Sequence, residues 1–368
     1  MLEYEGKYAK CKVMTDNIEE TAVTQIYGFL NSPAFEGATI RIMPDVHAGA
    51  GAVVGFTSTL TDKVIPNVIG VDIGCAIESY RLGKEVVTDF LALDNFIRAK
   101  IPSGFNVHEK VVPHRYDGLA QLEEIAERTE QDYGRVLRSL GTLGGGNHFI
   151  ELGVDQFDDK WLTIHTGSRN FGLKVATYHQ HIAEKAVGKR NGLAWLEGAT
   201  AKQYLADMLV AQEYAARNRA YIADRILQGF FGKSIGYVTR VGSVHNYIDF
   251  MDNVIRKGAI SAREHQLVVI PWNMRDGLII GRGKGNKDWN TSAPHGAGRV
   301  MGRGVAKKTI QLEDFQESMK GIWSSCISKD TLDESPMVYK DAETIKAEIG
   351  DAVEITNVVK PLYNFKAS

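Results

Sequence analysis

The sequence predicts an α+β protein with mixed and antiparallel sheets flanked by helices. Residues 38–82 form a run of short apolar segments that are rich in β-branched residues and separated by glycine, which is typical of strands. Elsewhere, apolar residues recur at three- and four-residue steps, which is typical of helices. The two kinds of segment do not alternate regularly, which disfavours a doubly wound parallel sheet. No repeat or proline-rich linker marks a boundary, so we expect residues 1–368 to form one domain.

Four strands are expected within residues 38–82, in the segments ATIRIM, AVVGFTSTL, VIPNVIGV and AIESYRL. Further strands are expected in WLTIHT (161–166), QLVVIP (266–271) and LIIG (278–281). A final sheet-forming segment begins with VEITNVV at residue 353.

Three helices follow from spacing and capping signals. Thr88 can cap a helix that runs to about Lys100, since apolar residues recur at helical spacing and Pro102 follows. Residues 117–139 carry one apolar stripe among many charges, which predicts a surface helix. A longer helix is expected over residues 201–227, where the apolar stripe indicates core packing.

The bulk composition is that of a soluble globular protein, with 44% hydrophobic and 24% charged residues. The net charge of −2 argues against a generally basic, nucleic-acid-binding coat. Three cysteines in no paired spacing argue against a disulfide framework and fit a reducing compartment. The sequence shows no signal peptide and no apolar run that could span a bilayer, so we expect a cytoplasmic protein without membrane contact.

Charge is concentrated in one segment. Residues 275–308 contain eight Lys and Arg against two Asp. On charge alone, this pattern favours a solvated surface. The thirty-seven glycines also cluster, in GAGAVVG, GTLGGGN, GRGKGN and HGAGRVMGRG, which indicates close approach of the backbone to a ligand.

Five side chains form a candidate metal site. Asp72 and Cys75 flank a tight turn in GVDIGC, and three histidines stand where a strand-like segment meets small or polar residues: His148, His165 and His245. Each histidine alone is typical of a hydrogen-bonded structural residue. Together, one carboxylate, one thiolate and three imidazoles suffice for one or two metal ions. Thiolate with imidazole favours zinc, so the ligands alone do not identify the metal.

His295 is a candidate nucleophile in SAPHGAGRVMGR. The small residues after it let the backbone approach a phosphate, and Arg299 adds positive charge. An imidazole with the ordinary pKa is largely neutral at pH 7 and can attack phosphorus. The competing interpretation is a glycine-rich turn with an incidental histidine. His47, in MPDVHAGAG, stays open.

The chain resembles the RtcB family of RNA-splicing ligases. The resemblance rests on motifs that occur in the family's order from about residue 43 to the end: MPDVHAGAG, GVDIGC, GTLGGGNHFIEL, IHTGSRNFG, YLADMLVAQEYAARNR, VHNY, SAPHGAGR and the C-terminal YKD.

This resemblance implies a single α+β domain whose central cleft binds metal and nucleotide. It implies a GTP- and Mn²⁺-dependent ligase that joins RNA 3′-phosphate or 2′,3′-cyclic phosphate ends to 5′-hydroxyl ends, in RNA repair or tRNA splicing. The implied route runs through a guanylylated His295 and an RNA-(3′)pp(5′)G intermediate. The basic segment 275–308 would then contact the RNA backbone.

Site residues are carried over motif by motif. The resemblance implies that two manganese ions are bound by Asp72, Cys75, His148, His165 and His245, with Cys75 between them. It implies that GTP is contacted by Asn147, His148, Phe149, Ile150, Glu151, His245, Asn246, Asn273, Met274, Gly296, Ala297, Gly298 and Lys366.

One segment departs from the family pattern. PWNMRDGLIIG (271–281) stands where the better-known branch has proline-glycine-serine-methionine and then another serine, and Leu278 falls about where that second serine would be. Two alternatives to a ligase remain: a metal-dependent RNA-end phosphodiesterase or phosphatase that does not use guanylylation, and a non-catalytic RNA-end binding protein. No motif indicates the oligomeric state or an activating partner.

Overall fold

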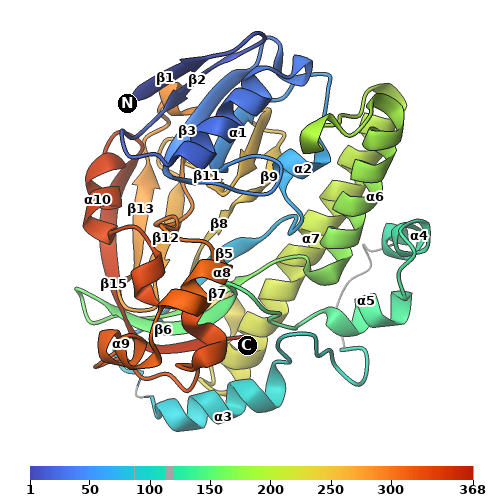
Figure 1. Ribbon diagram of the computed structural model, residues 1–368. Helices are drawn as coiled ribbons and strands as arrows, with labels where there is room; N and C mark the ends of the chain where they lie inside the picture. Colours follow the sequence, from blue (N-terminus) through green and yellow to red (C-terminus); the bar gives the residue numbers. More distant parts are fainter. Residues whose placement is uncertain (87, 113–119, 368) are drawn as a thin grey trace.

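Two large sheets organise the molecule in the computed structural model, which describes residues 1–86, 88–112 and 120–367. Figure 1 shows one sheet at the top, the other through the middle and lower part, and long helices along one side. The ladders of the two sheets are antiparallel except the one between β2 and β3. The predicted α+β class is therefore confirmed.

The first sheet has six strands and is closed on one face by α1 (Glu20–Leu30). Phe29 of α1, Phe35 and Phe56 pack edge to face beneath it. In spatial order, the strands are β1 (Leu2–Glu5), β2 (Lys10–Val13), β3 (Thr39–His47), β4 (Val54–Thr59), β10 (Val254–Lys257) and β9 (Asn246–Asp249).

The second sheet has seven strands, and the C-terminal strand lies inside it, between β13 and β6. In spatial order, they are β12 (Leu267–Asn273), β13 (Gly277–Gly283), β15 (Val353–Lys366), β6 (Phe149–Asp155), β7 (Lys160–Thr166), β5 (Ala76–Gly83) and β8 (Thr239–Val244). A separate pair joins β11 (Ala259–Ser261) to β14 (Ser292–Pro294).

The helices cover the sheets. α6 (Arg169–Val187) and α7 (Gly198–Gly229) lie side by side (Figure 1), and the apolar face of α7 packs on the second sheet through Ile222 and Ile226. The shorter helices are α2 (Pro66–Ile69), α3 (Phe90–Lys100), α4 (Ala120–Arg128), α5 (Tyr133–Ser139), α8 (Arg303–Thr309), α9 (Leu312–Ser318) and α10 (Ala342–Glu348). Short 3₁₀ turns are η1 (Pro33–Phe35), η2 (Arg190–Gly192), η3 (Ile235–Tyr237), η4 (Lys287–Trp289), η5 (Lys329–Glu334) and η6 (Pro336–Val338).

Most expected strands form, but the one predicted in VIPNVIGV does not. Pro66 begins the one-turn helix α2 there, and Gly70 follows it with a φ of 96°. Proline suits the first position of a helix, where no amide hydrogen is needed, and glycine readily takes the positive φ. Only Val64 retains sheet character, as an isolated bridge to Leu196.

Two helix predictions need correction. Asp89, not Thr88, caps α3, because its carboxylate accepts from the Ala92 amide at 3.0 Å. The helix predicted over 117–139 is two helices, since Glu130 has a φ of 55° and Asp132 caps α5 anew; residues 117–119 lie outside the described residues. The helix predicted over 201–227 is confirmed as α7.

Within the described residues, no helix has the length and apolar character needed to cross a membrane.

Candidate metal centre and nucleotide pocket

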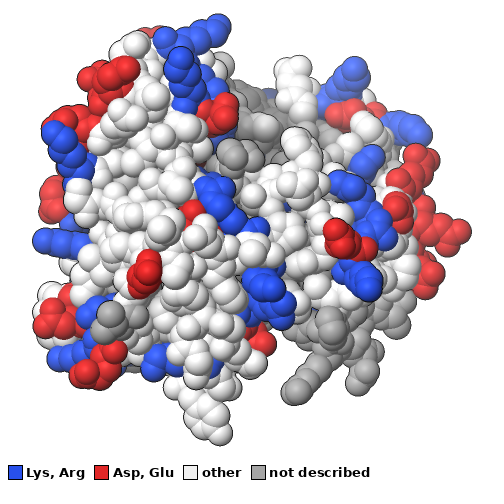
Figure 2. Space-filling view, turned by 90° about the horizontal axis from the view of Figure 1, so that it is seen from below, with Lys and Arg blue, Asp and Glu red and all other residues white. Residues whose placement is uncertain are grey.

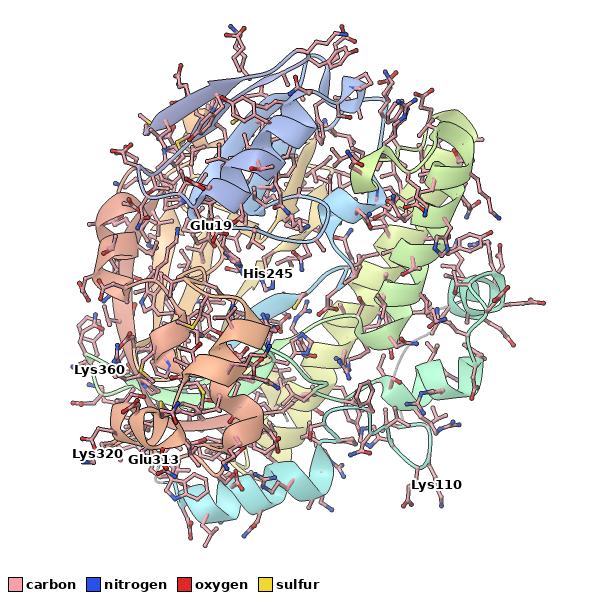
Figure 3. The ribbon with its side chains drawn as sticks, in the orientation of Figure 1. Glu19, Lys110, His245, Glu313, Lys320 and Lys360 are labelled. Carbon is pink, nitrogen blue, oxygen red and sulfur yellow. The ribbon has the colours of Figure 1, made fainter. Side chains whose placement is uncertain are left out.

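A cavity of about 380 Å³ opens between the two sheets and takes lining residues from both. His245, between β8 and β9, lies near the middle of the molecule (Figure 3). The start of β5, the start of β6, the end of β7 and the chain after β14 also reach this cavity. The C-terminal end of β15 completes the wall with Lys366.

The predicted metal ligands converge in the structure. Cys75 Sγ lies 3.2 Å from His165 Nε2 and 3.6 Å from His148 Nε2. His165 Nε2 lies 3.3 Å from His245 Nε2, and His148 Nε2 lies 3.0 Å from an Asp72 oxygen. Cys75, His148 and His165 are buried, and their donor atoms all lie within 4.8 Å of one another. Five side chains from four separate segments of the chain thus surround one small volume.

Hydrogen bonds on the far side of two imidazoles fix which nitrogen faces this volume. Leu143 O lies 2.9 Å from His148 Nδ1, and Asn147 O lies 3.1 Å from His165 Nδ1. A carbonyl oxygen only accepts, so each Nδ1 carries a proton and each Nε2 is the nitrogen that faces inward. Backbone partners of this kind orient histidines that bind metals.

The Asp72 contact fits a cation. A lone pair on His148 Nε2 and the Asp72 carboxylate repel each other at 3.0 Å unless a proton or a metal ion lies between them. The Ser168 amide donates to the other Asp72 oxygen at 3.0 Å and orients the carboxylate. Thiolate, imidazole and carboxylate donors at this spacing fit one or two divalent ions. The assignment of these five residues as ligands stays a prediction.

Burial shapes the protonation of the cluster. Burial, with additional repulsion from neighbouring histidines, lowers the pKa of His165 and His245 well below 6.5, so both stay neutral and able to coordinate. Burial, followed by the charge of Asp72, raises the pKa of the Cys75 thiol well above 9.0. A bound cation reverses that balance for the thiol, because coordination deprotonates it.

Helix α7 holds the loops of the candidate ligands in place, and its apolar stripe alone does not predict this role. The Arg219 guanidinium is buried and donates to Gly74 O at 2.9 Å and to Thr166 O at 3.0 Å. The Asn218 side chain bonds the loop before His148, accepting from the Gly141 amide at 2.7 Å. Residues adjacent to Cys75 and His165 are therefore fixed by one helix.

His295 lies beside the cluster, with its ring centroid 5.0 Å from that of His245. Its Nδ1 is 2.7 Å from a carboxylate oxygen of Asp45, which also accepts from the His295 amide at 3.2 Å. Asp45 is fully buried. The sequence alone does not indicate its contact with His295, because the two residues lie 250 positions apart. Its only signal in the sequence is its place in MPDVHAGAG, two residues before His47.

The turn after His295 brings backbone into the cavity, as its small residues predicted. Gly296, Ala297 and Gly298 all line the cavity. Gly298 has a φ of 76°, and a Cβ there would overlap the backbone of Asp45. Glycine is needed at this position both for its conformation and for the close approach to β3.

A buried charge cluster centred on Glu334 forms the wall near the C-terminus. Glu334 lies 2.7 Å from Lys366 Nζ, 2.8 Å from Arg303 and 3.3 Å from Arg299. Burial favours the protonated acid, but attraction to Lys366 and Arg303 outweighs it and lowers the pKa of Glu334 to about 2. Nothing in the local sequence of Arg303 or Glu334 indicates that the two residues are in contact.

Glu151 contrasts with Glu334. It also lines the cavity, but burial raises its pKa to about 8, and the Asn364 amide donates to it at 2.8 Å. The carboxyl is therefore largely protonated at neutral pH.

Lys257 is a further cavity residue that the sequence analysis missed. Its ammonium donates to Ala52 O at 2.9 Å and to Ala50 O, and no carboxylate pairs with it among the residues that the structure describes. Burial lowers its pKa to about 7. A lysine with unbalanced charge in a cavity is suited to a phosphate.

Most of the predicted nucleotide contacts reach the cavity. Within the described residues, Ile150 and His148 do not line it: Ile150 packs in the core of the second sheet, and His148 lies against Cys75. The predicted contacts that line the cavity are Asn147, Phe149, Glu151, His245, Asn246, Asn273, Met274, Gly296, Ala297, Gly298 and Lys366. Their contacts with GTP stay a prediction.

The departure at 271–281 has a physical basis. Leu278 is fully buried on β13 with Trp161 and Val359, so this position contributes to the core. Asn273 accepts from the amides of Arg275 and Asp276 at 2.9 Å and forms the turn between β12 and β13.

The basic segment 275–308 does not form one surface. Arg275 pairs with Asp276, and Lys307 lies 3.5 Å from Asp333. Of its eight basic residues, Arg299 and Arg303 line the cavity. Figure 2 views the molecule from below. On this face, basic side chains lie on both sides of the central hollow, and acidic side chains lie mostly toward the edges.

The buried Cys75, His148 and His165 group could hold a metal ion, and it lies near the carboxylate-held His295. With the cationic wall, this arrangement is of the class suited to phosphoryl or nucleotidyl transfer. The model of the family described as tRNA-splicing ligase RtcB matches residues 25–367. The chain therefore belongs to the RtcB family of RNA ligases.

Individual relatives agree. RNA-splicing ligase RtcB of Escherichia coli (strain K12) is 33% identical over 356 residues, covering 86% of this chain and 87% of the relative. The tRNA-splicing ligase RtcB of Aeropyrum pernix is 27% identical over 411 residues, with 86% and 85% covered.

Proposed function

We propose that the protein is a GTP- and Mn²⁺-dependent ligase that joins RNA 3′-phosphate or 2′,3′-cyclic phosphate ends to 5′-hydroxyl ends. The observation that carries the proposal is His295, held by Asp45 through Nδ1 and lying next to the candidate metal ligands. RNA repair and tRNA splicing both remain open as its biological setting.

Asp45 makes His295 a nucleophile. A carboxylate that accepts from Nδ1–H keeps the proton on Nδ1 and leaves the lone pair on Nε2. Among the described residues, His295 Nε2 has no hydrogen-bond partner. This nitrogen attacks the α-phosphorus of GTP, and the bond from that phosphorus to the β-phosphate oxygen breaks, which releases pyrophosphate.

The residues around His295 bind and orient the nucleotide. The Gly296–Gly298 turn lines the cavity, where its backbone amides would meet the phosphates, and Lys257 and Arg299 would supply positive charge. Lys366 and Glu151 would offer a donor and a carboxyl group to the guanine edge.

The later steps return His295 to its starting state. An oxygen of the RNA 3′-phosphate attacks the phosphorus on His295, the P–N bond breaks, and GMP passes to the RNA end. The 5′-hydroxyl then attacks the RNA 3′-phosphorus, a phosphodiester forms, and GMP leaves with its phosphate. Arg299 and Arg303 line the same cavity and would hold the RNA phosphates during both steps.

Two divalent ions would be held by Asp72, Cys75, His148, His165 and His245. When bound, they would polarise phosphoryl oxygens and supply a hydroxide at neutral pH for opening a cyclic phosphate. Thiolate and imidazole also suit zinc, so manganese rests on the family. All three cysteines are free and buried, which supports a reducing compartment such as the cytoplasm.

Labelling with GTP carrying ³²P at the α position tests the proposal. The protein with Mn²⁺ should take up an acid-labile label, and His295→Ala should take up none. A 3′-phosphate RNA and a 5′-hydroxyl RNA should then be joined by the labelled protein.

The alternatives predict other outcomes. Hydrolysis of RNA ends without label under several metals would identify a phosphodiesterase or phosphatase. RNA-end binding with neither label nor hydrolysis would identify a binding protein. Either result would sink the ligase proposal.

A further inference from the structure

The loop of residues 103–106 presents an aromatic ring to solvent. The Phe105 side chain is 95% exposed. Single exposed apolar residues are common and carry no conclusion alone. Whether Phe105 belongs to a binding surface depends on its backbone contacts, its position relative to the candidate site and the charges around it.

The backbone that carries Phe105 is held rigidly. The Gly104 amide donates to Gly144 O at 2.8 Å, and Ser103 forms a bridge to Gly144. Arg169 donates to Gly104 O at 3.1 Å, and Arg135 donates to Phe105 O at 3.0 Å. Two guanidinium groups therefore fix the carbonyls on each side of the ring.

This loop adjoins the candidate site. Gly144 precedes the ligand His148 by four residues, a path of at most about 14 Å. Arg169 follows Ser168, whose amide orients Asp72. A Cβ at Gly146 would come within 3.9 Å of the Arg303 guanidinium, so the same glycine loop also meets the cationic wall.

Two basic side chains, Arg135 and Lys174, line a cavity near this loop. The cavity measures about 130 Å³, and its lining includes Asn170 and the carboxylates of Glu130 and Asp132. Neither Arg135 nor Lys174 lies within ion-pair distance of a carboxylate in the part of the chain that the structure describes.

Lys110, four residues beyond this loop, is also exposed, and the adjacent exposed Glu109 balances its charge. Lys110 points away from the body of the molecule in Figure 3.

We propose that Phe105 is a stacking platform for an unpaired nucleobase of the RNA strand, within a few nucleotides of the joined ends, with Arg135 and Lys174 contacting the neighbouring phosphates. The inference rests on the proposed function for its RNA substrate. Proteins bind single-stranded RNA by combining an aromatic face with a cationic track, since every base can stack. The anchored backbone limits the positions that the ring can reach and so lowers the entropy cost of binding.

Variants of Phe105 test the platform. The probe is a fluorescein-labelled single-stranded 12-nucleotide RNA that ends in a 3′-phosphate. Phe105→Ala should weaken its binding roughly tenfold, and Phe105→Trp should retain it. Phe157 provides the control. It is an exposed phenylalanine in the turn between β6 and β7, at the end of these strands away from His148 and His165. Phe157→Ala should bind the RNA like the wild type.

A modified RNA locates the contact. A single abasic site, moved one nucleotide at a time from the 3′ end, should weaken binding by the wild type at one position. An abasic site at that position should change the RNA affinity of Phe105→Ala little or not at all. Equal losses in both proteins at every position would overturn the platform.

The labelling of His295 separates this inference from the ligase proposal, because it needs GTP but no RNA. Phe105→Ala should be labelled at the wild-type rate. Wild-type ligation together with wild-type RNA affinity in Phe105→Ala would contradict the platform alone. Failure of the wild-type protein to take up label and to bind RNA would overturn both proposals.

Discussion

Asp45 determines the chemistry available to His295. It is buried, and one of its oxygens contacts both Nδ1 and the amide of His295. The second oxygen has no hydrogen-bond partner among the described residues. A buried carboxylate in this arrangement is a costly feature that orients the imidazole and stabilises positive charge on it.

The variant Asp45→Asn tests this positioning role. The amide is of similar size but can donate to Nδ1 and so favour the tautomer with the proton on Nε2. The rate of His295 labelling by GTP should fall by on the order of 10²- to 10⁴-fold. Metal content should match the wild type, since Asp45 is not among the candidate ligands. An unchanged labelling rate would show that the carboxylate does not set the tautomer.

Glu151 predicts a pH dependence of stability. Its folded pKa of about 8 lies above the usual 4.5, so between these values the folded state binds a proton more tightly than the unfolded state. Its contribution to stability is fully present below pH 4.5 and is lost as the pH rises through about 8.

Glu151→Gln should remove the loss of stability at high pH, because glutamine does not ionise. Its side-chain oxygen can still accept from the Asn364 amide. The free energy of unfolding of the variant, relative to the wild type, should therefore rise by on the order of a few kcal/mol between pH 5 and pH 8.5. Urea denaturation at the two pH values measures this. The same relative stability at both would mean that Glu151 is ionised throughout.

At the level of elements, apolar periodicity predicts the helices and strands in which buried residues recur at one regular spacing. The long helix α7 and strands β5, β7 and β13 lie where their apolar patterns indicated. The segment VIPNVIGV shows the limit of this signal. A short apolar run fits a buried strand and a buried helical turn equally well, and Pro66 with Gly70 decided for the turn.

Helix ends were predicted less well, because neighbouring residues offer competing caps. Thr88 and Asp89 are both good capping residues, and only the backbone conformation decides between them. Asp89 has extended backbone angles and accepts from Ala92, whereas the Thr88 hydroxyl is buried without a partner among the described residues.

The cap of α3 is testable by a matched pair of variants. Asp89→Ala should lower the free energy of unfolding by about 1 kcal/mol, because it leaves amides of the first turn without an acceptor. Thr88→Val removes only an unpartnered hydroxyl and should cost much less. Chemical denaturation of both variants gives the comparison. A greater loss in Thr88→Val would restore Thr88 as the capping residue.

At the scale of the whole molecule, the sequence predicted which residue types the site uses but not what holds them. Asp45 reaches His295 across 250 positions, and Glu334 gathers Lys366 and Arg303 from two other segments. Such pairings depend on how the sheets pack against each other. Spacing along the chain contains no information on them, whereas family motifs identify the residues without their geometry.

The candidate ligands also connect the whole molecule. Asp72 and Cys75 precede β5, His148 precedes β6, His165 ends β7, and His245 lies between the two sheets. An unfolded chain does not hold these donors together, so metal binding should favour the folded state.

Metal should therefore raise the melting temperature, and Cys75 should be required for the effect. An ion at one hundred times its dissociation constant stabilises a protein by about 2.7 kcal/mol, which corresponds to a shift of several degrees. The shift should appear with Mn²⁺, vanish in Cys75→Ala, and persist in Cys11→Ala, which removes an equally buried thiol far from the cluster. Calorimetry of the three metal-stripped proteins with and without Mn²⁺ measures it. A full shift in Cys75→Ala would show that the thiol is not a ligand, and its loss in Cys11→Ala would show that the shift reports the integrity of the fold.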